Sequence, residues 1–150
     1  MTMEILKGLL QGYLSSLLDE GVVNDRFNEI VCVNNTGERQ CVVQRIETYF
    51  ADVDTILAEL SLDVDNSEVD FCKFASLARE IEDKSASIGA EHVRLACSDL
   101  IKAGDEMNKR VFFRSVLWVQ HEFTSTKKKL DAFIQMERRI IRIERSKSSN

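Results

Sequence analysis

An all-α fold is predicted for this chain by three observations. Its 150 residues include no proline, the residue that most strongly stops a helix, and only six glycines. Apolar residues recur three and four positions apart through most of the chain, whereas the alternation typical of a strand is nearly absent. Short polar segments separate these amphipathic stretches. Together these features predict an up-and-down helical bundle with an N-terminal helical extension.

The N-terminal part is expected to hold two helices. Gly21 falls where a C-terminal cap would end the first helix, and Asn24 or Asp25 can cap a short second one. The polar run 34–37 is typical of a loop. The apolar positions of the two helices are Ile5, Leu6, Leu9, Leu10, Tyr13, Leu14, Leu17 and Leu18, then Phe27, Ile30 and Val31.

Two longer helices follow, joined by a polar connection at 63–67. The second of them is expected to begin near Ser67 or Glu68 and to be interrupted at Gly89. At about 100° per residue, the apolar side chains of each helix fall on one face, which predicts its buried side. These residues are Val42, Val43, Ile46, Tyr49, Phe50, Val53, Ile56, Leu57 and Leu60, then Phe71, Phe74, Leu77, Ala78, Ile81 and Ile88.

The rest of the chain predicts a shorter helix that breaks at Gly104 and a long last helix that ends before the polar tail 146–150. The apolar positions of these two helices are Val93, Ala96, Cys97, Leu100 and Ile101, then Val111, Phe112, Val116, Val119, Phe123, Leu130, Phe133, Ile134, Ile140 and Ile141.

Charge is unevenly placed along the chain. Eight basic and three acidic residues lie from Lys127 onward, a net charge of +5, which leaves −10 for the rest of a chain whose total is −5. This end can attract an acidic partner. Alternatively it is a solvated helix end whose cations complement the helix dipole, and that interpretation is favoured because basic residues are commonly preferred there. Nucleic-acid binding is not expected, since aromatic residues do not alternate with the basic ones.

The four cysteines lack CxxC spacing and lie among apolar residues, so we expect reduced, mostly buried thiols rather than metal ligands. This use of cysteine is typical of a cytosolic or nuclear protein. No apolar run approaches the roughly 20 residues that cross a bilayer, so neither a signal peptide nor a membrane anchor is expected.

One segment resembles a known family. Ser85-Ala86-Ser87-Ile88-Gly89-Ala90, followed by Val93, Arg94 and Cys97, is similar to the helix signature of plant histidine-containing phosphotransfer proteins, His-Gln-Leu-Lys-Gly-Ser-Ser-Ser-Ser-Ile-Gly-Ala. The retained signature residues are Ser85, Ser87, Ile88, Gly89 and Ala90. The resemblance extends over 21–140. It implies a single helical domain, 1–150, in which about 38–140 form a four-helix phosphotransfer bundle and 1–34 an N-terminal helical extension.

The other half of the signature departs from the family. Counting back from Ala90, Arg79 stands at the position of the phosphoryl-accepting histidine. Glu80, Glu82 and Asp83 replace the Gln, Lys and Gly of the pattern. An arginine whose pKa exceeds about 12 offers no neutral nitrogen nucleophile, so no catalytic residue is expected in this motif.

The resemblance implies a pseudo-phosphotransfer protein that needs no cofactor or metal. Such a protein would bind receiver domains of hybrid histidine kinases and response regulators without carrying phosphate. It would compete with active phosphotransfer proteins and damp cytokinin-type two-component signalling, as a monomer in the cytoplasm and nucleus. The docking patch carried over from the family is Arg79, Glu82, Asp83 and Ala86, and the exposed side of Asp25–Glu29 is a weaker candidate.

Three alternatives stay open. Arg79 can simply pair with Glu82 and Asp83 on the helix surface. His92 or His121 can carry the phosphoryl group in an active phosphorelay mediator. Finally, the chain can be a helical scaffold that has lost receiver binding.

Overall fold

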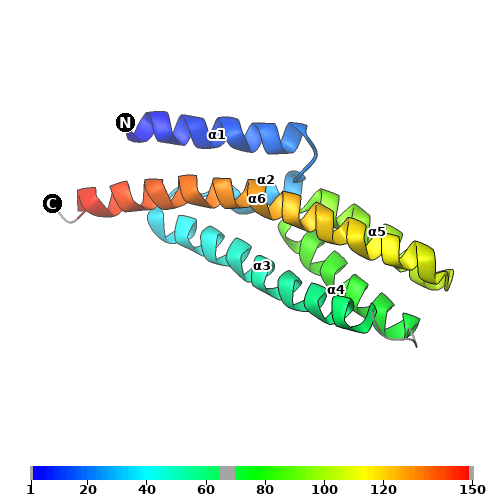
Figure 1. The fold of residues 1–150 in the computed structure, drawn as a ribbon. Helices are drawn as coiled ribbons and strands as arrows, with labels where there is room; N and C mark the ends of the chain where they lie inside the picture. Colours follow the sequence, from blue (N-terminus) through cyan, green and yellow to red (C-terminus); the bar gives the residue numbers. More distant parts are fainter. Residues whose placement is uncertain (1, 65–69, 149–150) are drawn as a thin grey trace.

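The computed structural model describes residues 2–64 and 70–148, and six helices account for nearly all of them (Figure 1). The predicted all-α fold is therefore confirmed. The helices are α1 (Met3–Asp19), α2 (Asp25–Val31), α3 (Thr36–Val64), α4 (Phe71–Ile88), α5 (Glu91–Asp105) and α6 (Lys109–Ser148).

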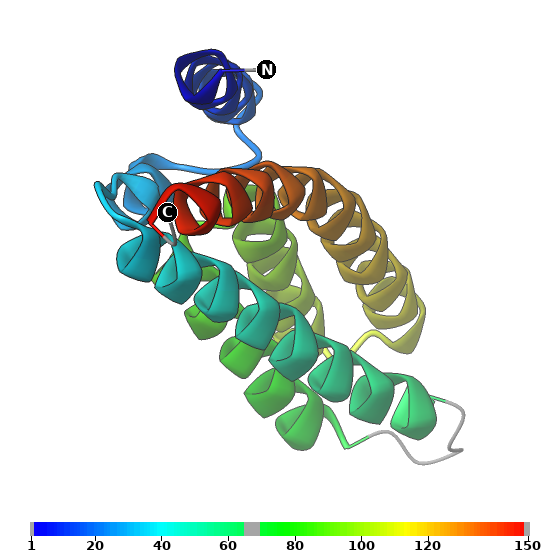
Figure 2. The ribbon, with the colours of Figure 1, turned by 90° about the vertical axis from the view of Figure 1, so that its left-hand side faces the viewer.

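Helices α3 to α6 form the four-helix bundle, and α1 lies on its outside along α6 (Figures 1 and 2). The longest helix, α6, packs against α1, α3 and α5. The Tyr13 hydroxyl donates to the backbone oxygen of Lys129 at 2.8 Å and so joins α1 to α6. Burial of the apolar stripes holds the bundle together, and its largest fully buried side chains include Phe27, Phe74, Phe112 and Phe133.

One charged pair lies inside the packing of α3 against α6. The Arg39 Nη1 atom donates to both carboxylate oxygens of Glu137, at 2.9 and 3.1 Å. The Glu137 side chain is only 1% exposed. Burial raises the pKa of Glu137 above its usual range, while the Arg39 guanidinium opposes that rise. This pair fixes the register of the two helices, because separating Arg39 from Glu137 would leave a buried charge without a partner.

Several predicted helix boundaries are confirmed by local capping chemistry. Gly21 and Gly89 both adopt positive φ angles, 74° and 83°, after the ends of α1 and α4. The Asn24 side chain caps α2 by accepting from the backbone nitrogen of Arg26 at 3.0 Å.

Two boundaries in the middle of the chain differ from prediction. Helix α3 continues to Val64, so Asp63 is helical and does not belong to the connection predicted for 63–67. The predicted start of the next helix at Ser67 or Glu68 lies outside the described residues. Helix α4 begins at Phe71 because the Asp70 carboxylate accepts from the backbone nitrogen of Lys73 at 3.1 Å and caps it.

The predicted break at Gly104 is displaced by one residue, because α5 ends at Asp105. Gly104 is buried inside α5, where a Cβ atom would lie 4.0 Å from the Phe112 ring. The chain turns instead at Met107, which has a φ of 56°, and Asn108 then caps α6. A side-chain cap that satisfies free backbone N–H groups thus decides this boundary.

Two further expectations are corrected. The last helix does not end before Ser146 but continues to Ser148, since Glu144 in this region is held by Lys7 of α1 at 3.4 Å and by the Thr36 hydroxyl. The thiols are not mostly buried. Only Cys97 is buried, because the other three lie on the polar sides or at the ends of their helices; they are Cys32, Cys41 and Cys72.

Candidate functional site

The signature segment occupies the second half of α4, with its two faces in different surroundings. One face is buried against the bundle, through Phe74, Ala75, Leu77, Ala78, Ile81, Ser85 and Ile88. On the opposite side, Arg79, Asp83 and Ala86 are exposed, and Glu82 is half-buried at the edge. These four residues occur at steps of three and four, so they follow one flank of the helix. We call them the α4 flank.

The retained half of the signature has a structural role at Ser85. Its hydroxyl is fully buried and lies 2.7 Å from the Tyr49 hydroxyl of α3. Burial raises the pKa of Tyr49 far above its usual range, so the phenol stays neutral in this bond. Ser85 therefore joins α4 to α3 and is not available to a partner.

Gly89 and Ala90 hold α2 against the turn between α4 and α5. The backbone oxygen of Gly89 accepts from the nitrogen of Asn24 at 3.0 Å, and the oxygen of Val22 accepts from the nitrogen of Glu91 at 3.1 Å. A Cβ atom on Gly89 would lie only 2.5 Å from the backbone nitrogen of Phe27. The glycine of the signature is thus required by the close approach of α2.

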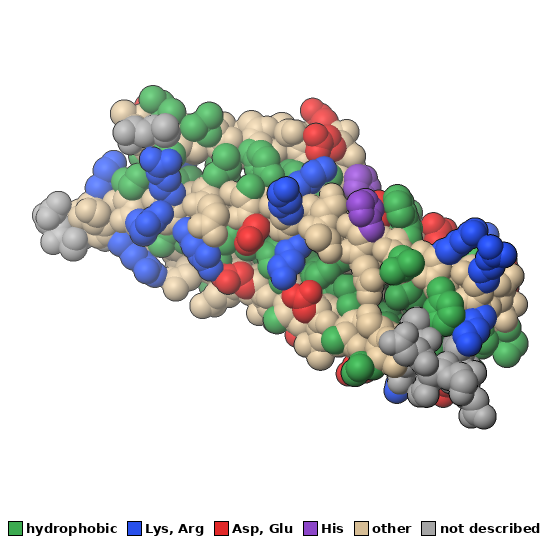
Figure 3. All heavy atoms as spheres, viewed as in Figure 1, with side chains coloured by type: hydrophobic (Ala, Val, Ile, Leu, Met, Phe, Trp, Pro, Cys, Tyr) green, Lys and Arg blue, Asp and Glu red, His purple; other side chains and the backbone are tan. Residues whose placement is uncertain are grey.

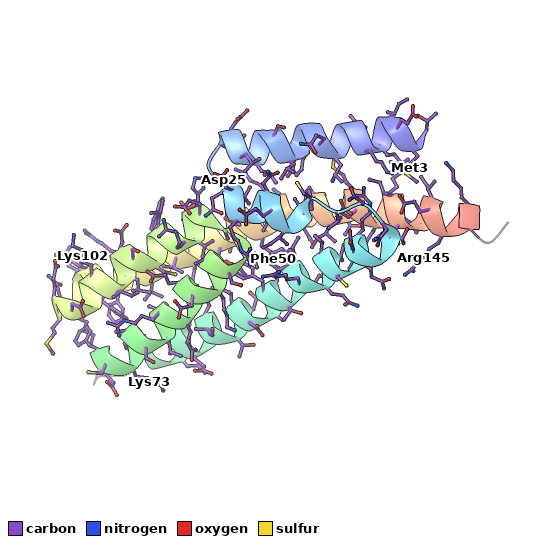
Figure 4. All side chains as sticks on the ribbon, turned by 180° about the vertical axis from the view of Figure 1, so that it is seen from behind. Met3, Asp25, Phe50, Lys73, Lys102 and Arg145 are labelled. Carbon is purple, nitrogen blue, oxygen red and sulfur yellow. The ribbon has the colours of Figure 1, made fainter. Side chains whose placement is uncertain are left out.

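A polar network reinforces this junction. The Glu91 carboxylate accepts from Asn24 Nδ2 at 2.7 Å and from Arg94 Nε at 3.1 Å. The hydrogen bond from Arg94 lowers the pKa of Glu91, and the bond from Asn24 adds to this effect. In Figure 4, which shows the molecule from behind, Asp25 of α2 lies beside the junction of α4 and α5, whereas Lys73 and Lys102 lie toward the far ends of α4 and α5.

The two candidate docking surfaces meet at Ser87. Its backbone oxygen accepts from Arg26 Nε of α2 at 3.2 Å and from Arg45 Nη2 of α3 at 3.5 Å. Asp25, Arg26 and Glu29 are exposed on α2. The exposed side of Asp25–Glu29 is therefore adjacent to the C-terminal end of the α4 flank, a proximity that the sequence separation of about 60 residues does not reveal.

The side chains of the altered half of the signature make few polar contacts with one another. Within residues 2–64 and 70–148, the Arg79 side chain makes no ion pair, so the expected pairing with Glu82 and Asp83 is not formed. Glu82 instead accepts a hydrogen bond from the Ser98 hydroxyl of α5 at 3.0 Å. Its orientation toward α5 explains why it does not reach Arg79.

On its other side the flank borders a hollow between α4 and α3, with a volume of about 490 Å³. Glu80, Asp83 and Lys84 line it from α4, and Asp52, Thr55 and Ile56 from α3. Lys84 Nζ lies 3.3 Å from the Asp52 carboxylate. The α3 contribution was missed by sequence reasoning, because Asp52 belongs to the polar side of another helix and only packing brings it next to the signature.

The resemblance implies that this surface offers no phosphoryl acceptor at the signature position, where Arg79 stands. On α4, the flank and its border carry the Arg79 guanidinium, which has no ion-pair partner among the described residues, beside three carboxylates, Glu80, Glu82 and Asp83. A fourth carboxylate, Asp52 of α3, is paired with Lys84. Carboxylates repel a dianionic phosphoryl group, and the guanidinium is not a nucleophile.

Both histidines lie elsewhere. His92 of α5 has its Nδ1 atom 3.8 Å from the Glu122 carboxylate of α6. His121 is exposed and stacks on Trp118 with the ring centroids 5.6 Å apart. Among the described residues, no three His, Cys, Asp or Glu side chains are grouped so as to hold a metal ion. In the same residues, no helix has the length and hydropathy to cross a membrane.

Comparison with known proteins places this geometry in a family. No protein-family model matches the chain. Histidine-containing phosphotransfer protein 1 of Arabidopsis thaliana is 30% identical over 132 residues, which cover 88% of this chain and 86% of that protein. Pseudo histidine-containing phosphotransfer protein 6 of the same plant is 26% identical, over 85% of this chain and 84% of that protein.

A solved structure agrees with both. The crystal structure of a histidine-containing phosphotransfer protein from maize superposes with a TM-score of 0.81 at 25% identity, covering 90% of this chain and 99% of that chain. The helical bundle, the retained glycine turn and the similarity along most of both chains lead to one conclusion: this chain belongs to the plant histidine-containing phosphotransfer protein family.

Proposed function

We propose that this chain is a pseudo-phosphotransfer protein, which binds receiver domains of a two-component phosphorelay and carries no phosphate itself. The observation that carries the proposal is Arg79, exposed on α4 at the position of the signature histidine. The receivers are those of hybrid histidine kinases and response regulators. By occupying them in place of an active phosphotransfer protein, this chain lowers the phosphate flux of cytokinin-type signalling, in the cytoplasm and the nucleus.

The pattern of substitution supports a binder over an unrelated scaffold. The four changed signature residues, 79, 80, 82 and 83, lie on or beside the exposed flank, whereas the retained Ser85, Gly89 and Ala90 hold the bundle together. The fold that presents the flank is thus intact, with α2 still placed next to it. Its surface remains charged and open, as expected for a protein interface that discriminates partners by electrostatics.

Phosphate transfer through the other histidines is less favoured on electrostatic grounds. A phosphoryl group on His92 would sit next to the Glu122 carboxylate, which is 3.8 Å from Nδ1. His121 stacks on Trp118, on a helix other than the one that carries the signature. In-line transfer requires a partner pocket positioned around one nitrogen, and the family signature positions it at α4.

The test is a reconstituted phosphorelay. A radiolabelled hybrid kinase, Arabidopsis histidine-containing phosphotransfer protein 1 and a response regulator are mixed, and this chain is titrated in while label on every species is followed. We expect no label on this chain and a dose-dependent loss of label on the regulator. Label on this chain that disappears in His92→Gln or His121→Gln would overturn the proposal. No label and no inhibition would leave only the scaffold interpretation.

Charge reversal locates the docking surface in the same assay. Arg79→Glu replaces the guanidinium of the flank with a further carboxylate and should weaken the inhibition. Arg110→Glu makes the same change at an exposed position at the start of α6, away from the flank, and should leave inhibition unchanged. Equal effects of the two variants would show that net charge, and not the α4 flank, controls binding.

A combined variant restores the family pattern. Arg79→His, Glu82→Lys and Asp83→Gly together supply the nucleophile, the cation and the close approach that the signature provides. We expect this variant to accept label from the kinase receiver. If the unaltered chain inhibits the relay but the restored variant accepts no label, the receivers dock somewhere other than the α4 flank.

A further inference from the structure

The single tryptophan of the chain is on the surface. Trp118 of α6 is 49% exposed, and two further large apolar side chains near it, Leu117 and Leu95, are 65% and 48% exposed. Tryptophan is usually well buried, and exposed apolar residues gathered in one place commonly mark a binding surface. Figure 3 shows the histidine side chains beside hydrophobic side chains on this part of the surface.

Trp118 borders a hollow between α5 and α6, with a volume of about 260 Å³. From α5 the hollow is lined by His92, Leu95, Ala96 and Asp99, and from α6 by Trp118 and Glu122. These α5 positions differ from Ser98, which faces Glu82 of the α4 flank. The hollow therefore lies on the other side of α5 from the α4 flank.

The stacking of His121 fixes one side of the indole. The two rings are 25° from parallel, with centroids 5.6 Å apart. A ring held by such a neighbour loses little conformational freedom when a ligand binds, which is one reason why tryptophan is enriched at the energetic centres of interfaces.

The charges of the lining are those of a cation site. Asp99 and Glu122 contribute two carboxylates, and the lining contains neither lysine nor arginine. Glu122 is only 16% exposed and faces His92. Asp99 is exposed and, among the residues that the structure describes, has no ion-pair partner. The face of an indole ring also attracts cations.

We propose that the Trp118 hollow is a second docking surface, which receives an arginine or lysine side chain of a partner protein. The cationic group lies between the Asp99 carboxylate and the Trp118 ring, and apolar residues next to it on the partner cover Leu95 and Leu117. Charge complementarity selects this occupant, since an acidic segment would meet the exposed Asp99 carboxylate, while Glu122 faces His92 and the lining holds no lysine or arginine. The surface is independent of the missing histidine and of receiver binding at the α4 flank.

The hollow contains its own reporter, because Trp118 is the only tryptophan. The full chain is titrated into the millimolar range with acetyl-Leu-Arg-Leu-Leu-amide while tryptophan fluorescence is recorded. The same peptide with citrulline in place of arginine keeps the shape and removes the charge, and one with glutamate reverses the charge. We expect a saturable change with the arginine peptide, binding about 3- to 10-fold weaker with citrulline, and none with glutamate.

Matched variants separate the site from general attraction to an acidic protein. Asp99→Asn should reduce binding of the arginine peptide to the level of the citrulline peptide. Asp105→Asn removes another exposed carboxylate from the end of the same helix, outside the hollow, and should change nothing.

Three results would overturn the proposal. The first is the absence of any saturable change in fluorescence. The second is equal binding of the arginine and citrulline peptides, or equal effects of the two aspartate variants, since the charge of the hollow would then select nothing. The third is self-association of the chain in sedimentation velocity that Trp118→Ala abolishes, which would assign the surface to a second copy of the chain.

Discussion

Replacing Gly89 with alanine tests whether the retained half of the signature is structural. Gly89 has a φ of 83°, a left-handed conformation that costs a residue with a Cβ about 1–2 kcal/mol. The new Cβ would also lie 2.5 Å from the backbone nitrogen of Phe27 and 2.5 Å from Asn24 Oδ1. Because a backbone atom cannot turn aside, α2 must move away from the turn between α4 and α5.

That movement has a calculable cost. It strains two backbone hydrogen bonds, from Asn24 to Gly89 and from Glu91 to Val22, each worth about 0.5–1.5 kcal/mol. Alanine recovers about 0.4–1 kcal/mol by restricting the unfolded chain. We therefore expect Gly89→Ala to lower the free energy of unfolding by about 1–5 kcal/mol and the melting temperature by roughly 2–20 °C.

Urea unfolding followed by far-UV circular dichroism measures this loss. Gly12→Ala is the matched control, because Gly12 lies within α1 and no atom is within 4 Å of its added Cβ. Alanine at Gly12 should stabilise the protein by up to about 1 kcal/mol through its helix propensity. A loss of less than about 1 kcal/mol in Gly89→Ala would refute the argument that α2 packs against this glycine.

Three more predictions concern groups away from the α4 flank. Arg39→Met should lower the free energy of unfolding by about 3–5 kcal/mol because it leaves Glu137 charged and buried, and adding Glu137→Leu should restore most of the loss in urea unfolding. The pKa of Glu91 is lowered below 4.5 by its bond to Arg94, so its stabilisation is complete above about pH 4.5 and is lost as the pH falls through the folded-state pKa. Glu91→Gln should therefore show a shallower loss of stability on acidification, and an unchanged slope would contradict this. Burial raises the pKa of the Cys97 thiol to about 12, so iodoacetamide at pH 8 should not modify it in the folded protein. Mass spectrometry should therefore count three adducts, on the exposed thiols of Cys32, Cys41 and Cys72. A fourth adduct would contradict the burial of Cys97.

Much of the fold could be predicted because helix formation is governed by nearby residues. The apolar spacing predicted the buried face of α4, and the glycine after it predicted the turn at Gly89. The end of α5 was predicted less accurately, because both Gly104 and Asn108 are residues that can mark a helix boundary. Gly104 is helical as the penultimate residue of α5, and the cap at Asn108 begins α6 after the turn.

The candidate site could be predicted only in part. The resemblance places Arg79 at the histidine position by counting along the chain, and the loss of the nucleophile is what that placement implies. Which neighbours share its surface does not follow. Glu82 was expected to accompany Arg79 but turns to Ser98, and Asp52 joins the hollow from a helix about 30 residues earlier.

By itself, the sequence determined the helical class of this protein and the glycine turn, because each depends on residues within a few turns of one another. Only the tertiary structure decided that Ser85 is tied to Tyr49, that α2 adjoins the end of α4, and that Trp118 and Asp99 share a hollow. These pairs are far apart in the chain. Their contacts arise because burial of the apolar faces brings the helices together. Which polar residues then become neighbours does not depend on how far apart they are in the sequence.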